Sequence, residues 1–347
     1  MARPGQTNSL CDVQRLSIGC AEDAEALTGV TVIVPQERAV CAVDVRGGGP
    51  GTRETDALRP ENLVDAVDAL VLAGGSVYGL AAADGVVAAM GAENKGFALI
   101  DMPGVPRSPV VPAAILYDLA NGGNKAWADA PPYAALGRKA YAARTNTVAL
   151  GNAGAGMGAM AGALKGGQGS ASIVTHDGFT VAALACVNCW GSTTLPGQRA
   201  FWAHAFEIDG EFGAAAPDLS KRFDMEDWHG AKMSAAPRAN TTLACVAVDA
   251  DLTPAEARRV AQMASAGLAR AIRPVYAPFD GDIVFALATA MRATPAPRAL
   301  AVARFGALAA DCLARAIARG VHAASALPYP GALPAWRDRF ARKEGPT

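Results

Sequence analysis

Short apolar runs rich in β-branched residues constrain the fold of this chain more than any other feature. Each run is about strand length, and most have Gly, Pro, Asn or Asp at one end or at both, which is typical of buried β-strands. They are expected over residues 30–34, 39–45, 170–175, 179–187, 241–248 and 283–288.

Helical patterns lie between these runs. The sequence Thr253-Pro254-Ala255-Glu256 has the form of a capping box with proline at the first helical position, and it predicts the start of a helix. Pro60 similarly opens an amphipathic pattern. The expected helices cover residues 60–72, 80–90, 254–272 and 299–319. Strands and helices mixed along the whole chain predict an α/β fold of packed layers.

Composition and charge exclude several classes of function. The 347 residues carry 31 basic and 32 acidic side chains, a net charge of −1, so no nucleic-acid partner is expected. The uncharged stretch 147–164 is too diluted by glycine to span a membrane. Seven scattered cysteines and an opening segment without an apolar signal predict a cytoplasmic protein with reduced thiols.

The segment Asn240-Thr241-Thr242 suggests one particular chemistry. If the peptide bond before Thr241 is cut, its hydroxyl becomes a nucleophile beside its own α-amine. Such an amine, with an ordinary pKa of about 7.7–8.0, can act as the local base, so no histidine is needed. The structural alternative is that Thr simply favours the strand and Asn the turn before it, and this segment alone favours that alternative.

Two carboxylates at Asp280 and Asp282 lead directly into the apolar strand that begins at residue 283. Acidic groups beside a buried strand need partners. They could hold an α-ammonium or orient a hydroxyl, as the third member of a catalytic triad orients its base. A solvated turn is the competing interpretation, since Asp-Gly-Asp also suits turns.

Lys165 and Asn188 complete the candidate set. Lys165 is the only charged residue between Asn146 and Gly169, and a lysine near a hydroxyl would favour the ionised form of that hydroxyl. Asn188 at the end of a predicted strand could donate an amide N–H to an oxyanion. Taken singly, each residue is more often structural.

The glycine-rich block offers an alternative of another class. Gly156, Gly158 and Ala161 fit a loose dinucleotide-binding pattern after a strand, which would make the chain a nucleotide-binding protein. Close packing of backbone is the better interpretation, because no clean βαβ unit surrounds the block. Cys186 and Cys189 form a C-x-x-C pair, but without a second pair or a histidine cluster a metal site is not expected.

Taken together, these residues resemble a known family. The resemblance rests on Asn240-Thr241-Thr242, on Asp280-Gly281-Asp282 with its strand, on Gly154-Ala155-Gly156-Met157 with Lys165, and on the turn at residues 46–52. The chain resembles the self-cleaving N-terminal-nucleophile peptidases, which include DmpA (L-aminopeptidase/D-esterase), β-peptidyl aminopeptidases and nylon-oligomer endohydrolases. The similarity runs from about residue 18 to about residue 315.

The resemblance implies a layered α/β sandwich of the DmpA type, made by a precursor that cuts itself between Asn240 and Thr241. The products would be an α-chain 1–240 and a β-chain 241–347, which stay associated as one α/β domain. Thr241 would be the nucleophile, with Asp280 and Asp282 as the acidic pair that positions it. By the same resemblance Lys165 would support the nucleophile and Asn188 would be the oxyanion donor. Tetramers of such αβ units are implied as well.

The resemblance also implies an amidase that needs no metal or organic cofactor. Thr after Asn and the Asp-Gly-Asp pair look most like the nylon-oligomer endohydrolases, whereas the N-terminal part looks closer to the aminopeptidases. The expected substrates are 6-aminohexanoate oligomers or similar ω-amino-acid amides, and short L-, D- or β-peptides come second. Acyl transfer, as in the similar ornithine acetyltransferases, is a further alternative.

Overall fold

The computed structural model describes residues 2–226, 228, 230–232 and 240–341. Within this part of the chain two five-stranded sheets form the centre of the molecule. The first sheet has the order β1-β2-β5-β6-β4. Its strands are β1 (Leu16–Asp23), β2 (Thr28–Pro35), β5 (Leu70–Ala73), β6 (Ala113–Ile115) and β4 (Thr52–Arg53).

The second sheet carries the strands that matter for function. Its order is β3-β12-β11-β10-β9. Its strands are β3 (Val40–Val45), β12 (Ile283–Arg292), β11 (Thr241–Ala250), β10 (Thr180–Asn188) and β9 (Gly167–Val174). All ten residues of β11 are buried, as expected for a central strand rich in apolar and β-branched side chains.

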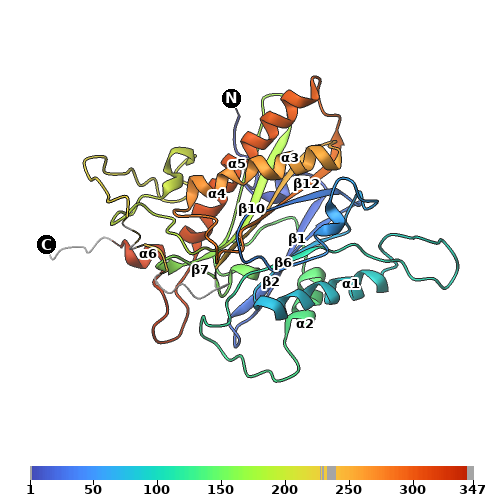
Figure 1. Cartoon of the computed structure of the whole chain (residues 1–347), viewed down its shortest axis with the longest axis horizontal. Helices are drawn as coiled ribbons and strands as arrows, with labels where there is room; N and C mark the ends of the chain where they lie inside the picture. Colours follow the sequence, from blue (N-terminus) through green and yellow to red (C-terminus); the bar gives the residue numbers. More distant parts are fainter. Residues whose placement is uncertain (1, 227, 229, 233–239, 342–347) are drawn as a thin grey trace.

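Helices cover the outer face of each sheet (Figure 1). Helices α1 (Ala82–Ala92) and α2 (Tyr133–Ala142) pack on the first sheet. Helices α3 (Pro254–Ala264), α4 (Ala266–Ala271) and α5 (Arg298–Ala323) pack on the second. A third apolar cluster, with Ile33, Leu72, Leu184 and Phe285, fills the space between the sheets. The predicted α/β layers are therefore confirmed, as an α-β-β-α sandwich.

At the level of elements, one expectation is wrong and one helix was missed. Residues 60–72 do not form a helix: Leu70 to Ala73 is the buried strand β5, and Leu63 is 92% exposed. Helix α2 was not expected, although it packs against α1 and the first sheet. The predicted helix 254–272 is present as the two helices α3 and α4.

The glycine block is packed against backbone. A Cβ atom on Gly156 would lie 2.3 Å from the amide nitrogen of Gln168, and one on Gly158 would lie 2.4 Å from the carbonyl oxygen of Leu27. Real Cβ atoms do not approach so closely, so only glycine fits at these positions. The packing interpretation of the block is thus confirmed.

The register of the second sheet brings three chain segments to one edge. Strands β10 and β11 are antiparallel, with Asn188 opposite Thr241. Strands β11 and β12 are parallel, so their first residues meet at the same edge. The end of β10, the start of β11 and the turn before β12 therefore lie together.

Two further observations concern the expected cellular setting. No helix in the described part of the chain is long and apolar enough to cross a membrane. All seven cysteines are free thiols.

Candidate active site

Thr241 and the peptide bond that precedes it are buried where the end of β10, the start of β11 and the turn before β12 meet. Thr241 is 3% exposed and Asn240 is fully buried. The Thr241 hydroxyl donates a hydrogen bond to the Asn240 carbonyl oxygen, and the amide nitrogen of Gly281 donates a second one to the same oxygen at 2.9 Å. The carbonyl is thus polarised by two donors while the hydroxyl lies beside it.

The two carboxylates flank Gly281, whose N–H contacts this peptide, and each is 1% exposed. Asp282 accepts hydrogen bonds from the backbone N–H groups of Thr242 at 2.8 Å and Tyr276 at 3.2 Å. Asp280 accepts from Trp190 N–H at 3.3 Å and Ala277 N–H at 3.2 Å. Four backbone donors therefore fix the pair in place.

Burial sets the electrostatics of this pair. It raises the pKa of both carboxyl groups, and the charge of Asp280 raises the pKa of Asp282 further. Two carboxylates this close do not both ionise easily in an apolar setting. A positive charge nearby would therefore be strongly favoured.

The turn after β3 supports the acidic pair from the side. Backbone N–H groups of Arg46 and Gly49 donate to the carbonyl oxygens of Asp282 at 3.0 Å and Asp280 at 2.7 Å. A Cβ on Gly47 would lie 2.3 Å from the Asp280 carbonyl oxygen. The turn needs glycine there because its backbone approaches the site so closely.

Asn188 is held next to Thr241 by its side-chain amide. Its Nδ2 donates to the Tyr117 carbonyl oxygen at 3.1 Å, and its Oδ1 accepts from Met160 N–H at 2.9 Å. The structure therefore brings together four of the five residues expected at the catalytic centre, namely Thr241, Asp280, Asp282 and Asn188.

Lys165 lies on the short strand β8 (Leu164–Lys165) and is 1% exposed. Its ammonium donates to the carbonyl oxygens of Gly156 at 3.0 Å and Gly166 at 2.7 Å. Burial lowers its pKa to about 7, opposed by the charge of the buried Asp118. The contacts of the described residues do not join Lys165 to Thr241 or to the acidic pair, and its catalytic role stays a prediction.

Lys232 is a site residue that sequence reasoning missed. Its ammonium donates to the carbonyl oxygen of Asn188 at 3.1 Å and to the Oδ1 of the same residue at 3.3 Å. It belongs to the segment 196–237, which has mixed charge and no periodicity and so looks like an exposed connection. Only its position shortly before Asn240 could have pointed to it.

A metal centre finds no support in the side chains that the structure describes. Among them, no three His, Cys, Asp or Glu residues gather as ligands. The chemistry that the site offers is that of a hydroxyl nucleophile, buried carboxylates, an amide donor and lysines.

Comparison with known proteins decides the family. The family model for peptidase family S58 matches residues 8–331, nearly the whole chain. This chain belongs to peptidase family S58. As a member of that family it is a hydrolase that acts on amide bonds, and the resemblance seen in the sequence is confirmed.

Curated relatives support the assignment to family S58. The chain is 44% identical to an uncharacterized aminopeptidase of Mycobacterium tuberculosis over 350 residues, covering 96% of this chain and 98% of the relative. It is 29% identical to a 6-aminohexanoate-oligomer endohydrolase of Agromyces sp., covering 80% of this chain and 74% of the relative.

Solved structures of similar fold complete the comparison. A β-aminopeptidase of Burkholderia sp. matches with a TM-score of 0.70 at 22% identity, over 97% of this chain and 92% of that one. An L-aminopeptidase D-Ala-esterase/amidase from Ochrobactrum anthropi, described as a variant of the Ntn hydrolase fold, matches with a TM-score of 0.67 at 20% identity, over 95% of this chain and 90% of that one. The expected DmpA-type sandwich is therefore confirmed as the fold of this family S58 member.

Proposed function

We propose that the protein is a self-processing amidase whose nucleophile is Thr241, made N-terminal by cleavage after Asn240. The observation that carries the proposal is the contact between the Thr241 hydroxyl and the Asn240 carbonyl, which also accepts the Gly281 N–H. The buried acidic pair next to it supplies the negative charge that a new α-ammonium would need as a partner.

Self-cleavage would proceed as an acyl shift followed by hydrolysis. Thr241 Oγ attacks the carbonyl carbon of Asn240 while the Gly281 N–H stabilises the oxygen. The C–N bond breaks, the nitrogen of Thr241 takes the hydroxyl proton, and an ester joins Asn240 to Thr241 Oγ. Water then hydrolyses the ester and leaves a carboxylate on Asn240 and a free α-amine on Thr241.

Turnover would reuse the same atoms. Thr241 Oγ attacks the amide carbonyl of a substrate, the α-amine takes the proton and returns it to the leaving amine, and water releases the acyl group. Asn188 would donate to the oxyanion, a contribution of about 3–4 kcal/mol for a side-chain donor. Asp280 and Asp282 would hold the α-ammonium, and Lys165 would favour the ionised hydroxyl. No metal or organic cofactor is required.

The first substrates to consider are 6-aminohexanoate oligomers or similar ω-amino-acid amides. The support is the Asn240-Thr241 junction and the Asp280-Gly281-Asp282 pair, which resemble the nylon-oligomer endohydrolases, together with the 29% identity to one of them. Aminopeptidase activity on short L-, D- or β-peptides is the second candidate, because the 44% identical relatives are named aminopeptidases.

The proposal extends to assembly and location. The α-chain 1–240 and β-chain 241–347 would stay associated, since strands from both belong to one sheet. A cytoplasmic homotetramer of αβ units is the expected form, acting on a small or oligomeric amide.

Intact mass of the purified protein tests the proposal. The wild type and Thr241→Ser, which keeps the hydroxyl, should each give two chains, and the smaller chain should begin at position 241 in both. Thr241→Ala should stay uncut and should not hydrolyse aminohexanoate oligomers or dipeptide amides. An uncut wild type that hydrolyses these amides, or an active Thr241→Ala variant, would show that the nucleophile lies elsewhere.

A further inference from the structure

Lys232 places a positive charge on Asn188, opposite Thr241, in the uncut chain. Its side chain is partly buried, and its ammonium lies within hydrogen-bond distance of both oxygens of Asn188, at 3.1 and 3.3 Å. Asn188 is the residue opposite Thr241 across β10 and β11. Lys232 therefore reaches the centre from the part of the chain that leads to Asn240.

The segment that carries Lys232 is fixed to the site by backbone and aromatic contacts. The amide nitrogen of Lys232 donates to the Trp190 carbonyl oxygen at 2.9 Å, and Ala163 N–H donates to the Gly230 carbonyl oxygen at 2.9 Å. The rings of Trp190 and Trp228 pack edge to face with centroids 5.5 Å apart. Because Trp190 N–H also holds Asp280, one turn anchors both the lysine and the carboxylate.

The charges around Lys232 explain why a cation is needed there. In the uncut chain the nitrogen of Thr241 belongs to a peptide bond and carries no charge, so it cannot balance Asp280 and Asp282. The ammonium of Lys232 lowers the pKa of Asp280 against the effect of burial. Desolvation lowers the pKa of Lys232 itself to about 8, while Cys189, Asp280 and Asp282 oppose this shift. The lysine is thus mainly protonated at neutral pH.

Lys165 is not the cation that could balance the charge of the acidic pair. Its ammonium donates to two backbone carbonyl oxygens, and the charge that opposes its burial is that of Asp118. The ammonium of Lys232 instead contacts Asn188, and its charge lowers the pKa of the buried Asp280.

We propose that Lys232 is a positioning residue for self-cleavage, whose ammonium takes the place of the α-ammonium that cleavage creates and holds Asn188 opposite Thr241. This inference rests on the proposed self-processing. After the cut, the α-ammonium of Thr241 shares the acidic pair, so the mature enzyme depends on Lys232 less than the precursor does. Lys232 therefore acts mainly in maturation.

The test compares the rate of cleavage with the rate of turnover. Full-length chains are made by cell-free translation, sampled over time and analysed by intact mass, and the cut fraction is then assayed on an amide substrate. Lys232→Met keeps the length of the side chain and removes its charge. It should slow cleavage by roughly tenfold to a hundredfold, the effect of losing a charge-assisted hydrogen bond, and lower kcat by a smaller factor.

Two controls separate positioning from general damage. Lys221→Met removes an exposed lysine of the same segment that pairs with Asp218, and it should be cut at the wild-type rate. Lys232→Ala should be cut slowly and be rescued by added ethylammonium, but not by ethanol, which has a similar size and no charge.

The outcomes are distinct. Cleavage of Lys232→Met at the wild-type rate overturns the inference, as does an equal loss of cleavage and kcat without rescue by ethylammonium. A wild type that is never cut overturns the proposed function together with it. Slow cleavage of Lys232→Met with a smaller loss of kcat, beside normal cleavage of the wild type and Lys221→Met, supports both.

Discussion

Thr241 is confined on the side where the turn before β12 approaches it. A Cβ on Gly281 would lie 2.6 Å from Thr241 Oγ and 2.9 Å from the Gly49 carbonyl oxygen. Gly281→Ala is therefore expected to push the hydroxyl away from the Asn240 carbonyl. A displacement of about 1 Å can lower a rate by about a hundredfold. The rate of self-cleavage, measured by intact mass over time, should therefore fall by about a hundredfold.

Gly91→Ala is the matched control for this variant. Gly91 lies in α1, and an added Cβ would meet no atom within 4 Å. The change should leave cleavage unaffected and raise the free energy of unfolding by about 0.5–1 kcal/mol, because alanine loses less entropy in a helix. Unchanged cleavage in Gly281→Ala would mean that the contact with Thr241 does not matter.

Lys165 makes stability depend on pH in a defined direction. Its pKa is about 7 in the fold and 10.5 in its ordinary state, so between these values the unfolded chain binds more protons. Stability should therefore rise with pH across this window and lose this contribution as pH falls through about 7. Lys165→Met lacks the effect.

The measurement is urea unfolding in the uncut Thr241→Ala background at several pH values. The difference in the free energy of unfolding, wild-type lysine minus methionine, should grow by about 1.4 kcal/mol per pH unit between about pH 7 and pH 10. Taking the difference cancels the other titrating groups, including the cysteines. A constant difference would show that Lys165 stays charged in the fold.

The buried polar residues differed in how clearly the sequence pointed to them. Thr241 and the pair Asp280 and Asp282 stand at the ends of strongly apolar strands, where a polar side chain is conspicuous. Lys232 and Asp118 carry no such signal, because they lie in irregular segments and their burial comes from tertiary packing. Asp118 accepts from Thr28 at 2.6 Å and Gly75 at 2.7 Å, contacts between residues far apart in the chain.

Among the elements, the strands of the second sheet were the best predicted. The largely apolar sequences of β10 and β11 fit strands that are buried on both faces of the sheet. Register, which brings Asn188 opposite Thr241, followed only from the structure, since an apolar strand without alternation does not specify its pairing.

Helical periodicity was misleading at residues 60–72 and invisible at α2. The apolar positions of 60–72 fit a helix, but Leu63 has no core to face, while residues 70–73 pair with β2 and β6. Tertiary pairing outweighed the local pattern. Helix α2 follows Pro131 and Pro132, which indicate a loop, although Pro132 stands at the N-cap and proline is tolerated at a helix start.

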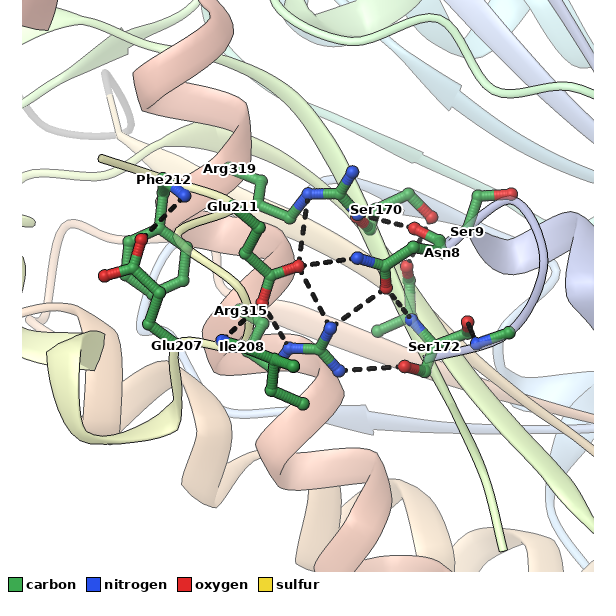
Figure 2. A network of polar contacts seen from close by, with 12 residues as sticks. Asn8, Ser9, Ser170, Ser172, Glu207, Ile208, Glu211, Phe212, Arg315 and Arg319 are labelled. Atoms are coloured by element: carbon green, nitrogen blue, oxygen red, sulfur yellow. Dashed lines mark hydrogen bonds and ion pairs between the residues drawn. The ribbon is translucent and has the colours of Figure 1, made fainter. Parts of the chain in front are cut away.

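For the molecule as a whole, cleavage would leave two chains held by packing and by polar contacts between them. Figure 2 shows one buried group of these contacts, where helix α5 meets the N-terminal segment and β9. Arg315 pairs with Glu211 through N–O distances of 2.5 and 3.0 Å, and it donates to the Ser172 carbonyl oxygen at 2.8 Å and Asn8 Oδ1 at 2.9 Å. Arg315 belongs to the proposed β-chain, and its three partners belong to the α-chain.

Arg315→Leu should therefore weaken the association of the two chains. The side chains of Arg315 and Glu211 are only 1% and 7% exposed, and removing one member of a buried ion pair costs about 3–5 kcal/mol because the other stays buried.

The control is Arg304→Leu, which breaks an ion pair to Asp177 at 2.8 Å that also joins the proposed chains but is about one-third exposed. Such pairs contribute about 1 kcal/mol or less. The cut proteins are analysed by native mass spectrometry at rising urea concentrations. Arg315→Leu should release its β-chain at a lower urea concentration than the wild type, and Arg304→Leu should release it at nearly the wild-type concentration. Equal release by the two variants would place the association in apolar packing alone.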